Sequence, residues 1–181
     1  MSKEDLFFEI GTEELPAGFI NPALDQLSTL IEGALKKARL AHGTVATLGT
    51  PRRLVLTVEG LSASQSDVSL EVKGPKKAAA YDAQGEPTKA LQGFARGQGV
   101  ELKDIEVRGE GKAEHVYATK HVKGKETAEL LPEILTGLIG ADLFRKTMRW
   151  GSGERAFARP IHWITALFGS NIIDFEYCSV R

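Results

Sequence analysis

The feature that most constrains the fold of this chain is a short alternating segment followed at once by a long amphipathic one. Apolar side chains alternate over residues 6–10, a period of two that predicts a β-strand. Between residues 16 and 40, apolar residues recur every three or four positions, which predicts a helix with one apolar face. Pro22 is tolerated only in the first turn of a helix, so we expect the helix to begin between Pro16 and Pro22. The helix must bury its apolar face, and the strand beside it predicts the sheet on which it packs.

The rest of the chain predicts further strands and one more helix. Strands are expected on either side of Gly49-Thr50-Pro51, and hairpins are expected from 105–108 with 115–122 and from 161–168 with 172–177. A second amphipathic helix is expected over 127–139, kinked or started late at Pro132. Helices and strands do not alternate regularly, so the pattern favours an α+β fold with a mixed sheet and the long helix packed on it. We expect 5–61 and 140–181 to share this sheet, with 6–10 at its centre because both faces of that strand are largely apolar.

A segment rich in glycine and lysine interrupts this pattern. A short helix is expected to open at Pro87-Thr88 and to close at Gly97 and Gly99, because glycine commonly ends helices. We therefore expect a small helical insertion at 74–103 and an α+β body formed by 1–73 and 104–181. The last residues read as a strand with no polar tail, which indicates a fragment of a longer polypeptide.

Composition excludes several classes of protein. The 181 residues are 42% hydrophobic and 26% charged, values typical of a globular chain that can bury a core. No apolar run approaches the roughly 20 residues that cross a bilayer, and the N-terminus has no signal-peptide pattern, so we expect a cytoplasmic protein with no membrane partner. The single cysteine, Cys178, and four scattered histidines predict neither a disulfide framework nor a local metal motif.

Three carboxylates in and after the first strand, Glu9, Glu13 and Glu14, could form an acid/base pair, a metal cradle or a helix start. Glu13 and Glu14 precede the long helix, where negative charge is favoured by about 0.3–1 kcal/mol each. Glu9 lies inside an apolar strand, and a buried carboxylate needs a partner, so we expect a structural acid paired with an arginine. Its candidate partners are Arg52, Arg53, Arg149 and Arg159. We assign no catalytic residue and no metal site to this stretch, because it offers too few oxygen ligands for a metal.

The net charge is −1, so binding to nucleic acid would depend on local patches of cations. The densest patch lies between residues 145 and 159, where cations alternate with aromatic rings. Cations neutralise phosphate and flat rings stack on unpaired bases, which favours RNA binding. The same pattern also fits a solvated face over core aromatics, and some of the cations could pair with the acids above. The candidate RNA-binding residues are Arg149, Trp150, Arg155 and Arg159, with Lys76 and Lys77 as a second patch.

Several segments together resemble one protein family. They are FFEIGTEELPA (7–17), TPRRLVLTVEGL (50–61), KGPKKAAAYDAQGEPTKALQGFARGQGV (73–100), HVKGKETAELLP (121–132) and KTMRWG…FARPIHWITALFG (146–169). In this order they resemble the N-terminal part of the β subunit of bacterial heterotetrameric glycyl-tRNA synthetase. Trp163 departs from the smaller residue expected at its position, so the packing of its strand is an open question.

The resemblance implies an enzyme that joins glycine to tRNA(Gly) through a glycyl-adenylate. ATP and Mg²⁺ would bind at the adenylate-forming site of the separate α subunit, and this fragment would hold no cofactor and no catalytic residue. The β subunit would contribute tRNA binding and subunit scaffolding to an α2β2 complex. The alternative is a hydrolytic, editing-like domain that acts on mischarged tRNA, which requires an acid or histidine to converge with a polar residue on a water molecule. No local motif of that kind is present, although distant residues could converge.

Overall fold

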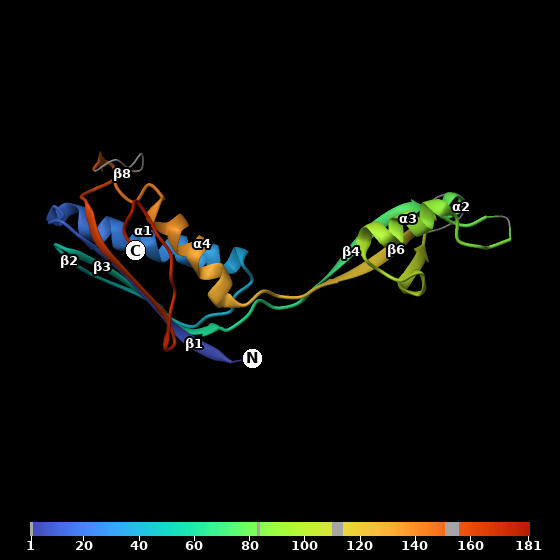
Figure 1. Cartoon of the computed structure of the whole chain (residues 1–181), viewed down its shortest axis with the longest axis horizontal. Helices are drawn as coiled ribbons and strands as arrows, with labels where there is room; N and C mark the ends of the chain where they lie inside the picture. Colours follow the sequence, from blue (N-terminus) through green and yellow to red (C-terminus); the bar gives the residue numbers. More distant parts are fainter. Residues whose placement is uncertain (1, 83, 110–113, 151–155) are drawn as a thin grey trace. The chain divides into compact units, whose positions relative to one another are not determined.

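The computed structural model describes residues 2–82, 84–109, 114–150 and 156–181, and the chain divides into two compact units (Figure 1). Unit 1 comprises Met1–Ser66 and Lys125–Arg181, and unit 2 comprises Asp67–Gly124. Unit 1 contains helices α1 (Ala17–Lys37) and α4 (Thr127–Ile139) and strands β1 (Lys3–Thr12), β2 (Val45–Thr50), β3 (Arg53–Ser62), β7 (Met148–Arg149), β8 (Ala156–Phe157), β9 (Ile161–Phe168) and β10 (Asn171–Ile172). Unit 2 contains strands β4 (Val68–Lys76), β5 (Ile105–Arg108) and β6 (His115–Val122), helices α2 (Lys77–Ala80) and α3 (Lys89–Gln98), and the 3₁₀ turn η1 (Leu102–Asp104).

The large sheet of unit 1 has the strand order β10-β9-β1-β3-β2, and all of these pairings are antiparallel. The α+β class is confirmed, but the expected mixed sheet is wrong for the described residues. Helix α1 connects β1 to β2, and strands joined by a helical crossover run parallel. A mixed sheet would result if β1 and β2 were neighbours. Strand β3 lies between them instead and pairs antiparallel with both. The predicted central position of residues 6–10, in a sheet shared by 5–61 and 140–181, is confirmed.

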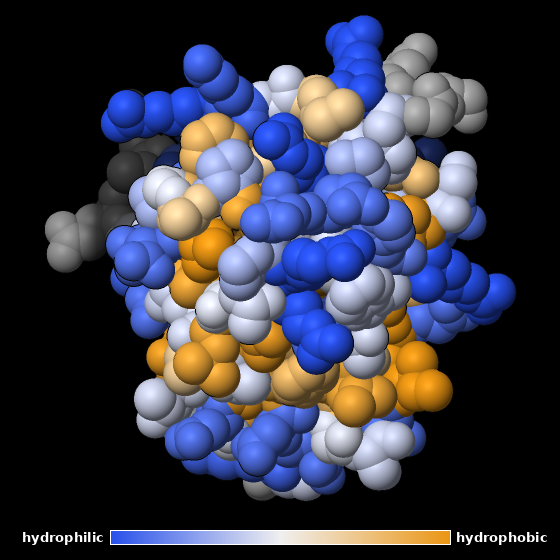
Figure 2. Space-filling view, turned by 90° about the vertical axis from the view of Figure 1, so that its left-hand side faces the viewer, coloured by the Kyte–Doolittle hydropathy of each residue, from blue (hydrophilic) through white to orange (hydrophobic). Residues whose placement is uncertain are grey.

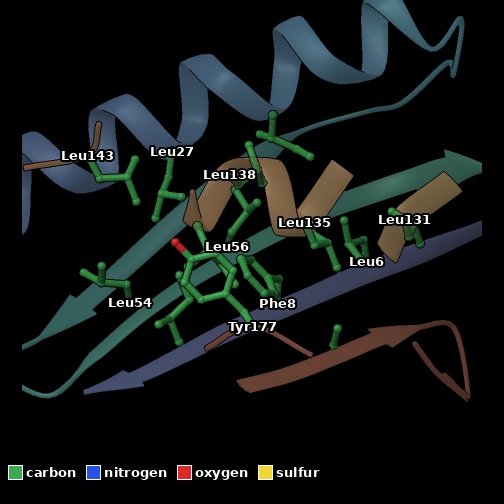
Figure 3. Packing of buried hydrophobic residues seen from close by; sticks show 14 of the residues in the cluster. Leu6, Phe8, Leu27, Leu54, Leu56, Leu131, Leu135, Leu138, Leu143 and Tyr177 are labelled. Atoms are coloured by element: carbon green, nitrogen blue, oxygen red, sulfur yellow. The ribbon is translucent and has the colours of Figure 1, made fainter. Parts of the chain in front are cut away.

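One face of this sheet is covered by α1 and α4, and the core lies between the two layers (Figure 1). Helix α1 begins just after Pro16, as expected, and α4 has the expected bounds with Pro132 inside it. Figure 3 shows leucines of α4 and Leu27 of α1 meeting the side chains of β1 and β3. Leu6 and Phe8 are each only 1% exposed, so the covered face of β1 is fully buried. Alternation in the strand and a four-residue spacing in the helix therefore produce one apolar layer, as the periodicities predict.

The C-terminal hairpin is shorter than expected. Strand β9 pairs with β10 over only two residues of β10, and the predicted strand over 172–177 does not form. Ile173 still donates its backbone N–H to the carbonyl of Ala166 in β9 at 2.9 Å, and beyond it the chain leaves the sheet. The side chains of Ile173 and Tyr177 are buried in the core of unit 1. The ring of Tyr177 lies beside Phe8 and Leu56 in Figure 3. Burial of these apolar side chains in the core thus replaces the sheet pairing that their alternation suggested.

Unit 2 has its own three-stranded antiparallel sheet in the order β4-β6-β5. The predicted hairpin of 105–108 with 115–122 is confirmed, and α3 ends at Gly99, whose φ of +68° is the left-handed conformation that glycine permits. Residues 74–103, which were expected as an insertion, lie within unit 2. Unit 2 contains more residues than that range, because β4 starts at Val68 and pairs with β6. Its small core consists of Ala80, Leu91, Ala95, Ile105, Val116 and Ala118. No helix in the described ranges is long and apolar enough to cross a membrane.

Candidate nucleic-acid interface

Three segments that are far apart in the sequence meet at one end of the large sheet. The backbone N–H of Thr12, at the end of β1, donates to the carbonyl of Arg52 in the β2–β3 turn at 2.9 Å. The N–H of Glu13 donates to the carbonyl of Pro160, just before β9, at 3.0 Å. Each of the three segments brings charged or aromatic side chains to this end. We call them the sheet-end cluster: Glu9, Glu13, Arg52, Arg53, His162 and Trp163.

Glu13 is the acid on which two side chains of the cluster, His162 and Arg52, converge. Its Oε1 lies 2.9 Å from Nε2 of His162, and its Oε2 lies 3.8 Å from Nη2 of Arg52. All three side chains are about half exposed, so water and salt screen these contacts, and each is worth under about 1 kcal/mol. These weak contacts orient the side chains and leave them able to bind a further charged group.

Glu9 has a different partner from the one expected. Its Oε1 accepts a hydrogen bond from the indole N–H of Trp163 at 2.7 Å, and none of the four candidate arginines lies within ion-pair distance. The expected arginine partner is therefore wrong for the described residues. The physical reason is burial: Glu9 is only partly buried, so a single strong hydrogen bond and water can satisfy its carboxylate.

Trp163 fits its strand because a glycine lies opposite it. Gly11 and Trp163 are register partners in β1 and β9, and a Cβ at Gly11 would overlap the indole ring. Arg53 pairs with Gly11 from the other side, and its guanidinium lies 5.6 Å from the centroid of the same ring. The departure from a smaller residue at position 163 is thus accommodated by Gly11, Glu9 and Arg53 together. The cation over the ring contributes about 0.5–1 kcal/mol at an exposed site.

The described part of the basic segment, residues 145–150 and 156–159, leads to the same end of unit 1. Arg149 is exposed on β7, which pairs with β8, and Arg159 is partly buried and donates to the carbonyl of Ala158 at 3.1 Å. Trp150 is partly buried against the core of unit 1, so part of its ring is already covered. Arg155 lies outside the described residues. Arg159 directly precedes Pro160, whose carbonyl binds Glu13, and this contact joins the basic segment to the sheet-end cluster.

Figure 2 looks at the side of unit 1 to which the end of β2 points in Figure 1. Hydrophilic residues cross the middle of this face and project from its upper edge, and apolar residues gather mainly below them. This face of unit 1 therefore presents polar and charged side chains beside an apolar area.

The second candidate patch lies in unit 2. Lys76 is exposed at the residue before α2, and Lys77 forms an ion pair with Glu114 at 3.1 Å. Lys77 is thus partly neutralised, and Lys76 has no ion pair with any described carboxylate. Across the described part of the chain, no three His, Cys, Asp or Glu side chains are grouped so that they could hold a metal ion.

Sequence reasoning identified the basic segment but missed the contacts of His162, Trp163 and Arg53. Each residue is visible in the sequence, and Arg52-Arg53 stands out as a basic pair. The sequence does not reveal the strand register. Gly11 of β1 pairs with both Arg53 of β3 and Trp163 of β9, and this register brings side chains of three strands together on one face. No local pattern carries that pairing.

Comparisons with known proteins give a consistent result. The family model described as the glycyl-tRNA synthetase beta subunit matches residues 6–181. The glycine–tRNA ligase beta subunit of Geobacter sp. (strain M21) is 49% identical over 177 residues, covering 98% of this chain and 26% of that protein. The corresponding protein of Trichlorobacter lovleyi is 48% identical over 181 residues, covering 100% of this chain and 26% of that protein. The chain therefore spans about a quarter of the length of the curated relatives it matches.

Proposed function

Because the chain belongs to the glycyl-tRNA synthetase beta subunit family, we propose that it forms part of a glycine–tRNA ligase and binds tRNA there. In this proposal the ligase is a cytoplasmic α2β2 enzyme that charges tRNA(Gly). The chemical step, with its ATP and Mg²⁺, belongs to the α subunit. The present segment contributes to tRNA binding and to subunit scaffolding within the complex.

The observation that carries the proposal is the gathering of cations at one end of unit 1. The cations are Arg52 and Arg53, from the β2–β3 turn and the start of β3, and Arg149 and Arg159, from the basic segment. The imidazole of His162, on β9, lies beside Arg52 on Glu13. Arginine presents a planar fork of donors that matches phosphate oxygens, and it also stacks on flat rings. Arginines from two segments, with the partly buried indole of Trp163 among them, provide both kinds of contact.

Internal contacts decide which cation is the best probe. Arg52 shares Glu13, Arg53 lies over Trp163, and Arg159 is partly buried. Arg149 is exposed, and no described carboxylate lies within ion-pair distance of it. Its replacement therefore removes a charge from the surface with little effect on the fold.

The test is Arg149→Ala in the full α/β enzyme, with tRNA affinity measured at several salt concentrations. A lost phosphate contact weakens binding and makes the slope of log K against log salt shallower by about 0.7–0.9. The preference for tRNA(Gly) over other tRNAs should not change. Lys36→Ala is the control, because Lys36 is an exposed cation near the C-terminal end of α1, about 30 Å along the helix from the start of α1 at 1.5 Å per residue. Equal affinity and slope for Arg149→Ala and the wild type would remove this residue from the tRNA path.

A hydrolytic, editing-like role is the second candidate, and the Glu13–His162 contact is the observation in its favour. A carboxylate 2.9 Å from an imidazole nitrogen is the arrangement that orients a general base. Both side chains are about half exposed, and a cavity of about 710 Å³ beside α1 is lined by other residues. A site so open to water would not protect a reaction, so we rank this role second. Deacylation of mischarged tRNA that is lost in His162→Ala would favour it over tRNA binding alone.

A further inference from the structure

The face of the large sheet opposite α1 and α4 carries a broad apolar surface, which we call the outer face. Strand register defines its members. Phe7 on β1 lies between Thr57 of β3 and Leu167 of β9, and Glu9 lies between Val55 and Thr165. Leu48 on β2 continues the row of Val55, and Ile172 on β10 continues the row of Leu167. The apolar members are Phe7, Leu48, Val55, Trp163, Leu167 and Ile172.

Burial separates this face clearly from the covered one. Leu48 is 70% exposed and Ile172 is 79% exposed, and they stand on opposite edge strands. Phe7, Val55, Trp163 and Leu167 are only partly buried, whereas Leu6 and Phe8 on the other face are 1% exposed. An exposed apolar surface that extends from one edge of a sheet to the other is unusual for a protein that works alone.

The outer face carries Arg53 in the row of Trp163, at the cationic end, and Glu9 among the apolar rows. The carboxylate argues for protein rather than nucleic acid as the occupant of those rows. Glu9 lies in the central strand, and one of its oxygens accepts the hydrogen bond from Trp163. The other oxygen has no hydrogen bond from any described residue, so it can accept one from a cation or an N–H group of an incoming protein. A carboxylate in this position repels phosphate, and the cations described above gather at the end of the sheet.

The size of the outer face argues for a segment of the same polypeptide. Five strands about 4.8 Å apart, over four residues of about 3.4 Å each, give a surface of roughly 20 Å by 14 Å. A stable interface between separate proteins buries about 800 Å² on each partner, which is well above this area. A helix of about 13 residues crosses 20 Å, and a segment of the same chain does not lose the translational freedom that a separate molecule loses. The curated relatives are about four times as long as this chain, so their subunits have ample sequence for such a segment.

We propose that an amphipathic helix from the same subunit, outside residues 1–181, covers the outer face in the full-length protein. Its apolar side lies on Phe7, Val55 and Leu167, and a basic or N–H donor group lies opposite Glu9. The sheet then has helices on both faces, with α1 and α4 on one side and this helix on the other.

Photo-crosslinking from position 48 in the full-length subunit tests the proposal. A photoreactive phenylalanine analogue replaces Leu48, and the crosslinked peptides are identified by mass spectrometry in the assembled α/β enzyme. We expect the major crosslink to join position 48 to an apolar, helix-patterned peptide of the same subunit beyond residue 181. Mixing isotopically heavy and light subunits separates crosslinks within one chain from those between copies. Glu32 is the control position, because it is exposed on α1 on the other side of the sheet.

Each other result overturns the proposal and names a different occupant. A crosslink between heavy and light subunits identifies a second copy, one to the α subunit identifies the partner, and one to tRNA identifies nucleic acid. A crosslink to residues 67–124 assigns the face to unit 2. A weak crosslink similar to that of position 32 means that the face is open.

Cysteine labelling provides a second readout that does not depend on crosslink yield. Leu48→Cys and Ile172→Cys replace exposed side chains, so they leave the core intact. In the full-length subunit alone, a maleimide should label both at least tenfold more slowly than Glu32→Cys, at all protein concentrations. Labelling is followed on the peptide that carries the new cysteine, so Cys178 does not interfere. Equal rates at all three positions would overturn the proposal.

Discussion

The close fit of Trp163 against Gly11 gives a sharp test of the sheet register. Gly11→Ala places a methyl group where the indole ring lies, and the neighbouring atoms belong to the ring itself rather than to a flexible chain end. Relief requires the ring to move, which costs about 1–3 kcal/mol as overpacking. Movement also weakens the hydrogen bond to Glu9, worth about 1 kcal/mol. We therefore expect Gly11→Ala to lower the free energy of unfolding of unit 1 by about 2–3 kcal/mol.

A double-mutant cycle with Trp163→Ala isolates this contact. Without the ring the added methyl group meets open space, and alanine is favoured over glycine in a strand by about 0.5–1 kcal/mol. The cost of Gly11→Ala should then vanish, which gives a coupling energy of about 2 kcal/mol or more between the two sites.

Urea unfolding measures the free energy of unfolding of the wild type, of each single variant and of the double variant. Trp150 and Trp163 both belong to unit 1, and Trp150 still reports unfolding when Trp163 is absent. Gly33→Ala is the control, because a Cβ there meets nothing within 4 Å and the residue lies in α1; it should stabilise by about 0.5–1 kcal/mol. A cost for Gly11→Ala that is the same with and without the indole ring would refute the register argument.

Three further predictions follow from the contacts described above. Glu9→Gln should change the stability to urea by less than about 1 kcal/mol, because the amide oxygen can still accept the indole hydrogen bond; a loss of 3–5 kcal/mol would instead indicate a buried ion pair. Arg181 donates a hydrogen bond to Asp174 and so holds the pKa of that carboxyl below its ordinary value. The contribution of this pair to stability is therefore present above the ordinary pKa and is lost as the pH falls through the lowered one; Arg181→Gln should raise the pKa of Asp174 in an NMR titration. The chain of residues 1–181 alone should not catalyse glycine-dependent pyrophosphate exchange, because its sequence contains no nucleotide-binding loop; measurable exchange would contradict the assignment of that step to the α subunit.

Periodicity was sufficient to predict the elements that form the core. Alternation over residues 6–10 indicates a strand, and the three- and four-residue spacing of α1 indicates an amphipathic helix. The central strand and the helix on it were therefore predicted correctly. The same reasoning failed at residues 172–177, where alternation predicted a strand. Ile173 still donates its backbone N–H to Ala166 of β9, but no strand continues from there to Tyr177. Both side chains are buried in the core, because burial rewards apolar side chains whether or not their backbone continues a strand.

The partner of Glu9 could not be predicted, because three separate facts determine it. Register places Trp163 beside Gly11, the absence of a side chain at Gly11 makes room for the ring, and the ring's N–H then reaches Glu9. Sequence reasoning correctly required a partner for a carboxylate in an apolar strand. Arginine was predicted because a buried carboxylate was expected to need a cationic partner. A half-buried carboxylate is instead satisfied by a neutral hydrogen-bond donor and water.

The position of Trp163 also explains how one sheet can serve two kinds of partner. Its ring lies where the outer face meets the cationic end, with Glu9 holding the indole N–H and Arg53 lying over the ring. The carboxylate faces the apolar rows of the sheet, where it disfavours phosphate, and the guanidinium belongs to the end at which the cations gather. A tRNA bound at the end and a helix packed on the outer face would occupy neighbouring surfaces of opposite character, with Trp163 at the border between them.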